Sequence, residues 1–83
     1  MANETEVLDT IRSIARTELE LEQPVDPADD LLADLGLDSL GLTVLAVGLE
    51  NRFRVKLSQE DAVGLRTVGD LAKLVVRRTE ASA

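Results

Sequence analysis

The residues best suited to chemistry stand together in one short string, Asp-Leu-Gly-Leu-Asp-Ser-Leu at positions 34–40. Within it, Ser39 follows Asp38 and directly precedes a segment with helical spacing. A nucleophilic serine would need a neighbouring base, but the chain contains no His and no Cys, which excludes Ser-His and Cys-His systems and most zinc sites. No strand-turn-helix elbow precedes Ser39, so a hydrolase is not indicated. By position alone, Ser39 is an N-cap serine.

Acidic residues crowd the loop before this string: Asp26, Asp29, Asp30 and Asp34. Carboxylates in a loop can hold a calcium ion, but these residues lack the alternating spacing, central glycine and final glutamate of an EF-hand. We therefore expect a solvated, charged loop and no metal site.

Length and charge narrow the possible functions. The chain has 83 residues, of which 45% are hydrophobic, and Phe53 is its single aromatic residue. This composition suits one domain over residues 1–83 with a compact aliphatic core, and we expect a monomer. A net charge of −7 argues against binding nucleic acid or an anionic membrane surface, and it suits basic protein partners.

Targeting signals are not evident in the sequence. The first 20 residues are charged and periodic rather than a signal peptide, and the apolar runs are too short to span a bilayer. We therefore expect a cytoplasmic protein. The initial Met and the small size favour a free-standing chain.

Hydrophobic periodicity predicts the two longest helices. Apolar residues recur every three or four positions from Glu4 to Leu21, and Asn3 followed by Glu6 resembles a capping box. The same spacing predicts a second helix from Ser39 to about Phe53. Its expected core face consists of Leu42, Leu45, Leu49 and Phe53.

After the second helix, residues 52–57 alternate like a strand but have no second strand to pair with, so we interpret them as an extended connector. A short helix should begin at Ser58 and end near Gly64. Thr67–Asp70 again resembles a capping box, and the last helix follows it.

The last helix should end near Arg77 and Arg78, because cations suit a helix C-terminus. Residues 79–83 would then form a frayed tail, and the ordered core would span about residues 4–78. These elements predict an all-α fold, a bundle of three main helices and one short helix.

A long loop, ending at Asp38, separates the first two helices. Its two prolines stop the first helix. Connections of this length are usually functional or disordered, but leucines should pin this one to the core. These are Leu31, Leu32, Leu35 and Leu37.

Three motifs in order resemble those of acyl carrier proteins. The Leu-Gly-Leu-Asp-Ser-Leu string at 35–40 resembles the family's Leu-Gly-x-Asp-Ser-Leu signature. Leu49–Phe53 is similar to its Leu-Glu-x-x-Phe motif, and Thr67–Leu71 to its Thr-Val-x-Asp-Leu motif. The resemblance covers about residues 7–76 and implies the family's four-helix bundle.

By that resemblance, Ser39 would carry 4′-phosphopantetheine, installed from coenzyme A by a phosphopantetheinyl transferase. The thiol of this arm would hold an acyl group as a thioester, a chemistry that the Cys-free chain lacks. Asp38 would contact the transferase and its metal ion, or it would be only a cap or a charge on the helix dipole. The chain would be a non-catalytic carrier that serves ketosynthase, acyltransferase or acyl-activating enzymes.

A second apolar stripe on the second helix consists of Leu40, Val44 and Val47. It is either buried by the flanking loop or the short helix, or it is a docking surface for partner enzymes together with Glu50, as in the family. Gly41 and Val44 stand where relatives often carry acids. This departure favours a specialised pathway, such as polyketide assembly, over primary fatty-acid synthesis.

Two other functions stay open. A peptidyl or aryl carrier of non-ribosomal peptide synthesis usually has a Gly-Gly-(His or Asp)-Ser pattern, whereas Leu37 follows Gly36 here, which favours the acyl type. A helical interaction domain without a prosthetic group would need Ser39 to be only a cap.

Overall fold

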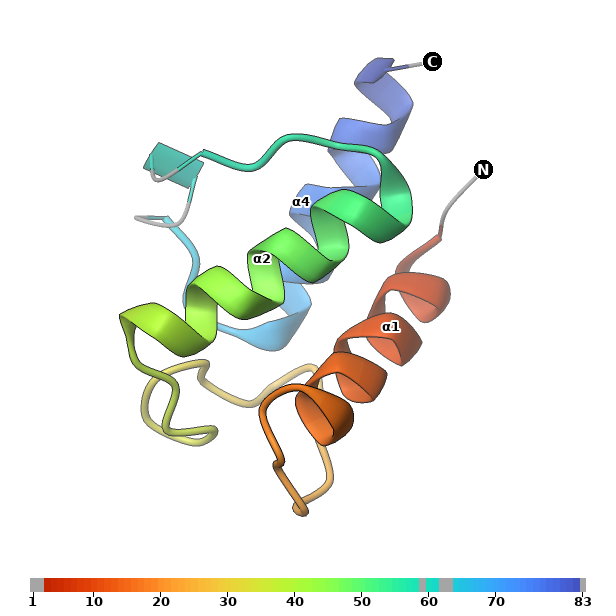
Figure 1. The fold of residues 1–83 in the computed structure, drawn as a ribbon. Helices are drawn as coiled ribbons and strands as arrows, with labels where there is room; N and C mark the ends of the chain where they lie inside the picture. Colours follow the sequence, from red (N-terminus) through yellow and green to blue (C-terminus); the bar gives the residue numbers. More distant parts are fainter. Residues whose placement is uncertain (1–2, 59, 62–63, 83) are drawn as a thin grey trace.

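The computed structural model describes residues 3–58, 60–61 and 64–82. Three helices form the fold: α1 (Glu4–Thr17), α2 (Ser39–Phe53) and α4 (Val68–Ser82). They pack against one another, with α1 in contact with both of the others (Figure 1). No strand occurs among the described residues, so the predicted all-α class is confirmed.

The predicted short helix after Ser58 lies partly outside the described residues. Glu60 and Asp61 are helical, whereas residues 59, 62 and 63 are not described. This fourth helix therefore stays a prediction.

Each helix turns one apolar stripe toward a shared core. The spacing of these residues is the one that predicted the helices, and α2 begins and ends at the predicted residues. In the centre, Val7, Ile11, Leu49 and Val75 are fully buried. Leu42 and Phe53 complete the expected core face of α2 as half-buried residues.

The start of α1 is as predicted, but its end is not. Asn3 Oδ1 accepts a hydrogen bond of 2.8 Å from the Glu6 N–H, as expected of an N-cap. The helix ends at Thr17 rather than at Leu21, because Glu20 adopts a left-handed conformation with φ of 55°. The chain then folds back, and the Leu21 N–H donates to the Ala15 carbonyl at 2.9 Å.

The start of α4 has the predicted capping box. The Asp70 N–H donates to Thr67 Oγ1 at 3.1 Å, and the Thr67 N–H donates to an Asp70 carboxylate oxygen at 3.2 Å. The helix runs to Ser82, so the predicted end near Arg77 and Arg78 was wrong, whereas the fraying expected for residues 79–83 stays a prediction. Residues 79–82 include neither Gly nor Pro, and nothing in them stops a helix.

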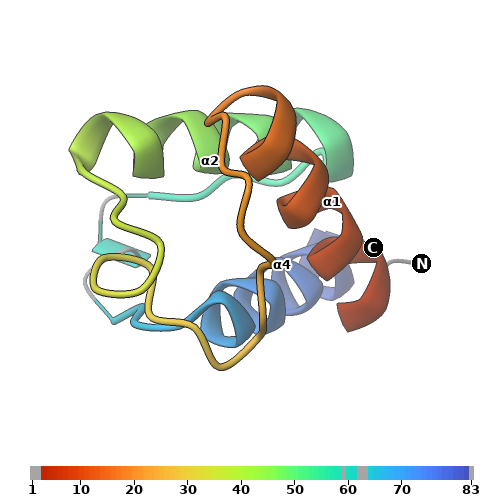
Figure 2. The same ribbon diagram turned by 90° about the horizontal axis from the view of Figure 1, so that it is seen from below.

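The long loop passes the start of α4 before it returns to α2 (Figure 2). Backbone hydrogen bonds tie it there: the Leu31 N–H donates to the Arg66 carbonyl at 2.9 Å, and the Val68 N–H donates to the Asp29 carbonyl at 3.0 Å. The second bond satisfies the Val68 N–H, which is one of the free N–H groups at the start of α4. Both bonds hold the loop as a fixed part of the fold.

Three of the four loop leucines are buried as predicted: Leu31, Leu35 and Leu37. Leu32 is the exception, because 59% of it is exposed. Residues 31–35 form a turn, so positions 31 and 35 share one face and position 32 points away from it.

Two carboxylates accept backbone hydrogen bonds where the loop meets α4: Asp30 in the loop and Asp70 in the first turn of the helix. The backbone N–H groups of Ala33 and Leu32 keep the pKa of Asp30 below its usual range, and Arg66 adds to the effect. Likewise, the Thr67 N–H lowers the pKa of Asp70. A carboxylate whose pKa is lower in the folded than in the unfolded state stabilises the fold above its unfolded pKa of about 3.9.

We therefore predict that the free energy of unfolding falls as the pH drops below about 4, through the folded pKa values of these carboxylates. Asp30→Asn should reduce this pH dependence, whereas Glu22→Gln, at an exposed position of the same loop, should preserve it. Urea unfolding followed by circular dichroism at several pH values measures both. An Asp30→Asn slope equal to that of the parent chain would contradict the prediction.

Candidate functional site

Ser39 is the first helical residue of α2, and it is exposed. The N-cap is Asp38, whose Oδ1 accepts a hydrogen bond of 2.8 Å from the Gly41 N–H. A cap of this kind stabilises a helix by about 1 kcal/mol. Because Asp38 is the cap, the interpretation of Ser39 as the capping residue was wrong. The hydroxyl stands at the helix start without that structural duty.

The chain before Ser39 is anchored on both sides of a sharp turn. Leu35 and Leu37 are buried, while Gly36 between them is exposed and left-handed, with φ of 68°. The Leu37 N–H donates to the Leu31 carbonyl at 3.2 Å. These contacts hold Ser39 at the surface while Leu35 and Leu37 enter the core.

Gly41 lies inside the start of α2 rather than on its surface. A Cβ at this position would lie 3.3 Å from Leu37 Cδ2 and 3.4 Å from Asp38 Oδ1. The first distance is short for a side chain in a packed region, and the second is at the limit of ordinary contact. The glycine therefore lets Leu37 and the capping carboxylate close over the helix start, a role that the sequence pattern did not reveal.

The second apolar stripe of α2 faces solvent. Leu40 is 72% exposed and Val47 is 46% exposed, and Val44 is half-buried. Burial of the stripe under the loop, one of the two expectations, is therefore not observed for Leu40 and Val47. Glu50 lies differently, because it is half-buried and its Oε2 accepts a hydrogen bond of 2.8 Å from the Leu57 N–H.

The electrostatic surroundings of Ser39 are one-sided. Residues 17–51 contain nine acids and no Lys or Arg. Asp34 and Asp38 are the exposed carboxylates nearest to Ser39 in the chain. Arg66 pairs with Asp30 at 3.3 Å, but the other acids of this stretch leave it with a strong excess of negative charge, which attracts cationic side chains of an approaching protein.

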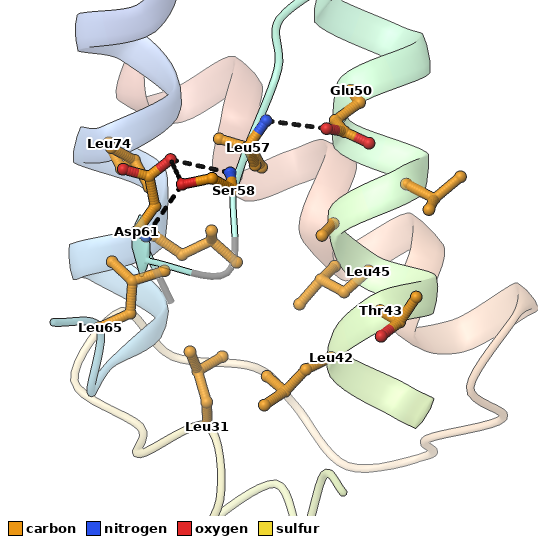
Figure 3. Close-up of a pocket in the computed structure, with 13 residues that line it drawn as sticks. Leu31, Leu42, Thr43, Leu45, Glu50, Leu57, Ser58, Asp61, Leu65 and Leu74 are labelled. Carbon is orange, nitrogen blue, oxygen red and sulfur yellow. Dashed lines mark hydrogen bonds between the residues drawn. The ribbon is translucent and has the colours of Figure 1, made fainter. Parts of the chain in front are cut away.

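An apolar cavity of about 260 Å³ lies between α2, the chain that follows it and α4 (Figure 3). Leucines dominate its lining, and Thr43, Ser58 and Asp61 add polar atoms. Thr43 is one helical turn from Ser39 and donates its hydroxyl to the Ser39 carbonyl at 2.8 Å. The sequence did not distinguish this cavity from core, because its leucines have the same spacing as packed residues.

Residues 3–58, 60–61 and 64–82 contain neither a metal-binding cluster nor a membrane-spanning helix. In this part of the chain, no three acidic side chains are grouped so that they could hold a metal ion. None of the helices described has the length and apolar character needed to cross a bilayer.

Comparison with known proteins gives a consistent result. Residues 9–75 match the family described as "Phosphopantetheine attachment site". The meromycolate extension acyl carrier protein of Mycolicibacterium aurum is 32% identical over 80 residues, which cover 96% of this chain and 76% of that protein. The protein of the same name from Mycobacterium tuberculosis is 31% identical, over 64% of its length.

Solved structures agree in fold. An acyl carrier protein from Mycobacterium tuberculosis superimposes with a TM-score of 0.77 at 31% identity, over 86% of this chain and 96% of that one. The acyl carrier protein of Thermotoga maritima gives a TM-score of 0.84 over 96% and 94% of the two chains. At 24% identity, this second likeness supports the fold alone.

The left-handed turn before the site can be tested by itself. Gly36→Ala should lower the free energy of unfolding by about 1 kcal/mol, because an L-residue is strained at this φ. Gly64→Ala is the matched control, since a Cβ meets nothing within 4 Å at either glycine and only Gly36 has a positive φ. Urea unfolding measures the difference, and equal stabilities of the two variants would contradict the role of the turn.

Proposed function

The chain belongs to the family of acyl carrier proteins, whose members carry covalent 4′-phosphopantetheine, and we propose that Ser39 is the residue that carries it here. The observation behind this proposal is the division of roles at the start of α2. Asp38 caps the helix, and Ser39 stands exposed beside it. A helix N-terminus also favours an attached phosphate, because its N–H groups and dipole attract an anion.

Loading would be performed by a separate phosphopantetheinyl transferase. The Ser39 oxygen would bond to the phosphorus that bears the pantetheine of coenzyme A, and adenosine 3′,5′-bisphosphate would leave. The thiol of the arm then supplies the thioester chemistry. Asp38 cannot turn freely toward the transferase while it caps α2, so its first role is to hold the helix start.

The cargo that suits this chain is an acyl chain. The cavity beside α2 begins one turn from Ser39, and most of its lining residues are leucines, so it could enclose a hydrocarbon chain with favourable burial of methylene groups. The sequence points the same way, because Leu37 follows Gly36 where peptidyl carriers usually have a second glycine. The acyl type of carrier is therefore preferred to the peptidyl type.

A specialised acyl pathway fits the surface of α2. The helix carries no acid in its first turn, and Gly41 has a packing role where relatives often have an acid. Two similar proteins are named for meromycolate extension, which is itself a specialised form of acyl-chain growth. We infer that ketosynthases or acyltransferases of such a pathway are the partners.

Partner enzymes would approach along the outward stripe of α2. Leu40 and Val47 give them an apolar contact beside the arm, and the acids before the helix favour basic side chains on the partner. A few well-packed, desolvated contacts near the centre of an interface usually carry most of its affinity.

Attachment at Ser39 is tested by intact mass. Incubation with coenzyme A and a broad-range phosphopantetheinyl transferase should add one phosphopantetheine to the chain. Ser39→Ala should abolish the gain, whereas Ser13→Ala, at an exposed serine of α1, should retain it. If the folded chain gains no mass, or if Ser39→Ala still gains it, the assignment is wrong.

Docking on α2 is tested with the same transferase. Val47→Glu should leave the helical circular-dichroism signal intact and raise the KM for the carrier about tenfold, the effect of losing one apolar contact that contributes about 1.4 kcal/mol. Ser13→Glu adds the same charge on α1 and should change the KM less than about twofold. Equal effects of the two substitutions would show that net charge, and not the stripe, sets the affinity.

A further inference from the structure

One wall of the cavity is a short stretch of chain without regular structure. Residues 55–58, here called the connector, follow α2 and are not part of any helix. Leu57 and Ser58 face the cavity from this wall (Figure 3). Val55 is the connector residue that is buried in the core, and Leu57 is half-buried and packs against the core, whereas Lys56 and Ser58 are exposed.

From the α2 side, Glu50 holds the connector. Its Oε2 accepts the hydrogen bond of 2.8 Å from the Leu57 N–H (Figure 3). Glu50 also lines the cavity. A carboxylate acceptor makes this bond stronger than one between neutral groups.

From the α4 side, Arg78 holds the connector in two ways. Its Nη1 donates directly to the Lys56 carbonyl at 3.0 Å, and its Nη2 pairs with Asp61. Asp61 in turn accepts hydrogen bonds of 2.9 and 3.0 Å from the N–H and the hydroxyl of Ser58. Arg78 therefore controls the backbone on both sides of Leu57.

These contacts act on the connector backbone and add little to the core. In the described part of the chain, the N–H groups of Leu57 and Ser58 bond to carboxylates and to no other backbone group. Besides the packing of Val55 and Leu57, the position of this wall depends on Glu50 from α2 and on Arg78 from α4 with its partner Asp61.

Building on the proposed function, we propose that Glu50 and Arg78 form a two-sided clasp on the connector and determine how long an acyl chain the cavity encloses. With the clasp closed, the wall at Leu57 limits the space beside α2. A chain that fills this space stabilises the protein, and further methylene groups gain nothing unless the wall moves. If either side of the clasp is weakened, the wall can move and the cavity can enclose a longer acyl chain.

The first experiment needs no cargo. Amide hydrogen exchange of the unloaded protein is measured by NMR for Arg78→Met, Glu50→Met and the matched control Arg77→Met. Exchange at Ser58 should rise about tenfold in Arg78→Met, and exchange at Leu57 should rise similarly in Glu50→Met. Arg77→Met should match the parent chain, and Glu50→Gln, which keeps an acceptor oxygen, should remain close to it.

The second experiment loads Ser39 with butyryl, octanoyl, dodecanoyl or palmitoyl phosphopantetheine from the acyl-coenzyme A, using the broad-range transferase. The Tm of the parent chain should rise with chain length and then reach a plateau. Glu50→Met and Arg78→Met should move the plateau to a longer member of the series, whereas Arg77→Met should leave it in place. A merely structural role would lower every Tm without moving the plateau.

Each outcome has a clear meaning. Unchanged exchange at Leu57 and Ser58 in both Met variants would overturn the clasp, and a plateau that stays in place despite faster exchange would overturn its role in chain length. If one Met variant does not fold, the variant on the other side of the clasp still tests the proposal. Absence of loading is recorded separately as absence of mass gain, which rejects the attachment site while the exchange data still judge the clasp.

Discussion

The hydrogen bond from the Gly41 N–H to the Asp38 carboxylate decides where α2 begins, and the remaining features of the site follow from that point. It places Ser39 as the first helical residue and leaves its hydroxyl outside the cap. A glycine at position 41 is part of the same device, because a larger residue would press on Leu37 and on the capping oxygen. The helix start is therefore both well fixed and open to a modifying enzyme.

The long loop holds the start of α2 in place, although few of its residues are buried in the core. Buried leucines hold it from within, and backbone bonds to Arg66 and Val68 join it to the start of α4. Its acidic side chains lie outside the core, and the N–H groups of Ala33 and Leu32 keep Asp30 ionised. The loop, the cap and the exposed Ser39 thus form one connected structure.

The two faces of α2 have different tasks in a carrier protein. Leu40 lies toward solvent, Leu42 and Leu45 line the cavity, and Val47 lines the cavity while 46% of it is exposed. Under the proposed function, a carrier must offer its cargo to enzymes and also protect it between reactions. One helix can meet both needs because residues three and four apart share a face, so different faces of α2 can serve docking and shelter.

Local patterns in the sequence determined the helices, the N-cap at Asn3, the capping box at Thr67 and the bounds of α2, because these depend on contacts within a few residues. The order of three short motifs gave the resemblance to acyl carrier proteins. The ends of α1 and α4 were missed, since Glu20 gives no sign of its left-handed conformation and residues 79–82 have no strong helix signal. Tertiary structure alone decided that Leu32 is exposed, that Glu50 binds the connector, and that leucines from the loop, α2, the connector and α4 line a cavity. Periodicity records which face of a helix is apolar, but it does not record what lies opposite that face, because the partners are far away in the chain.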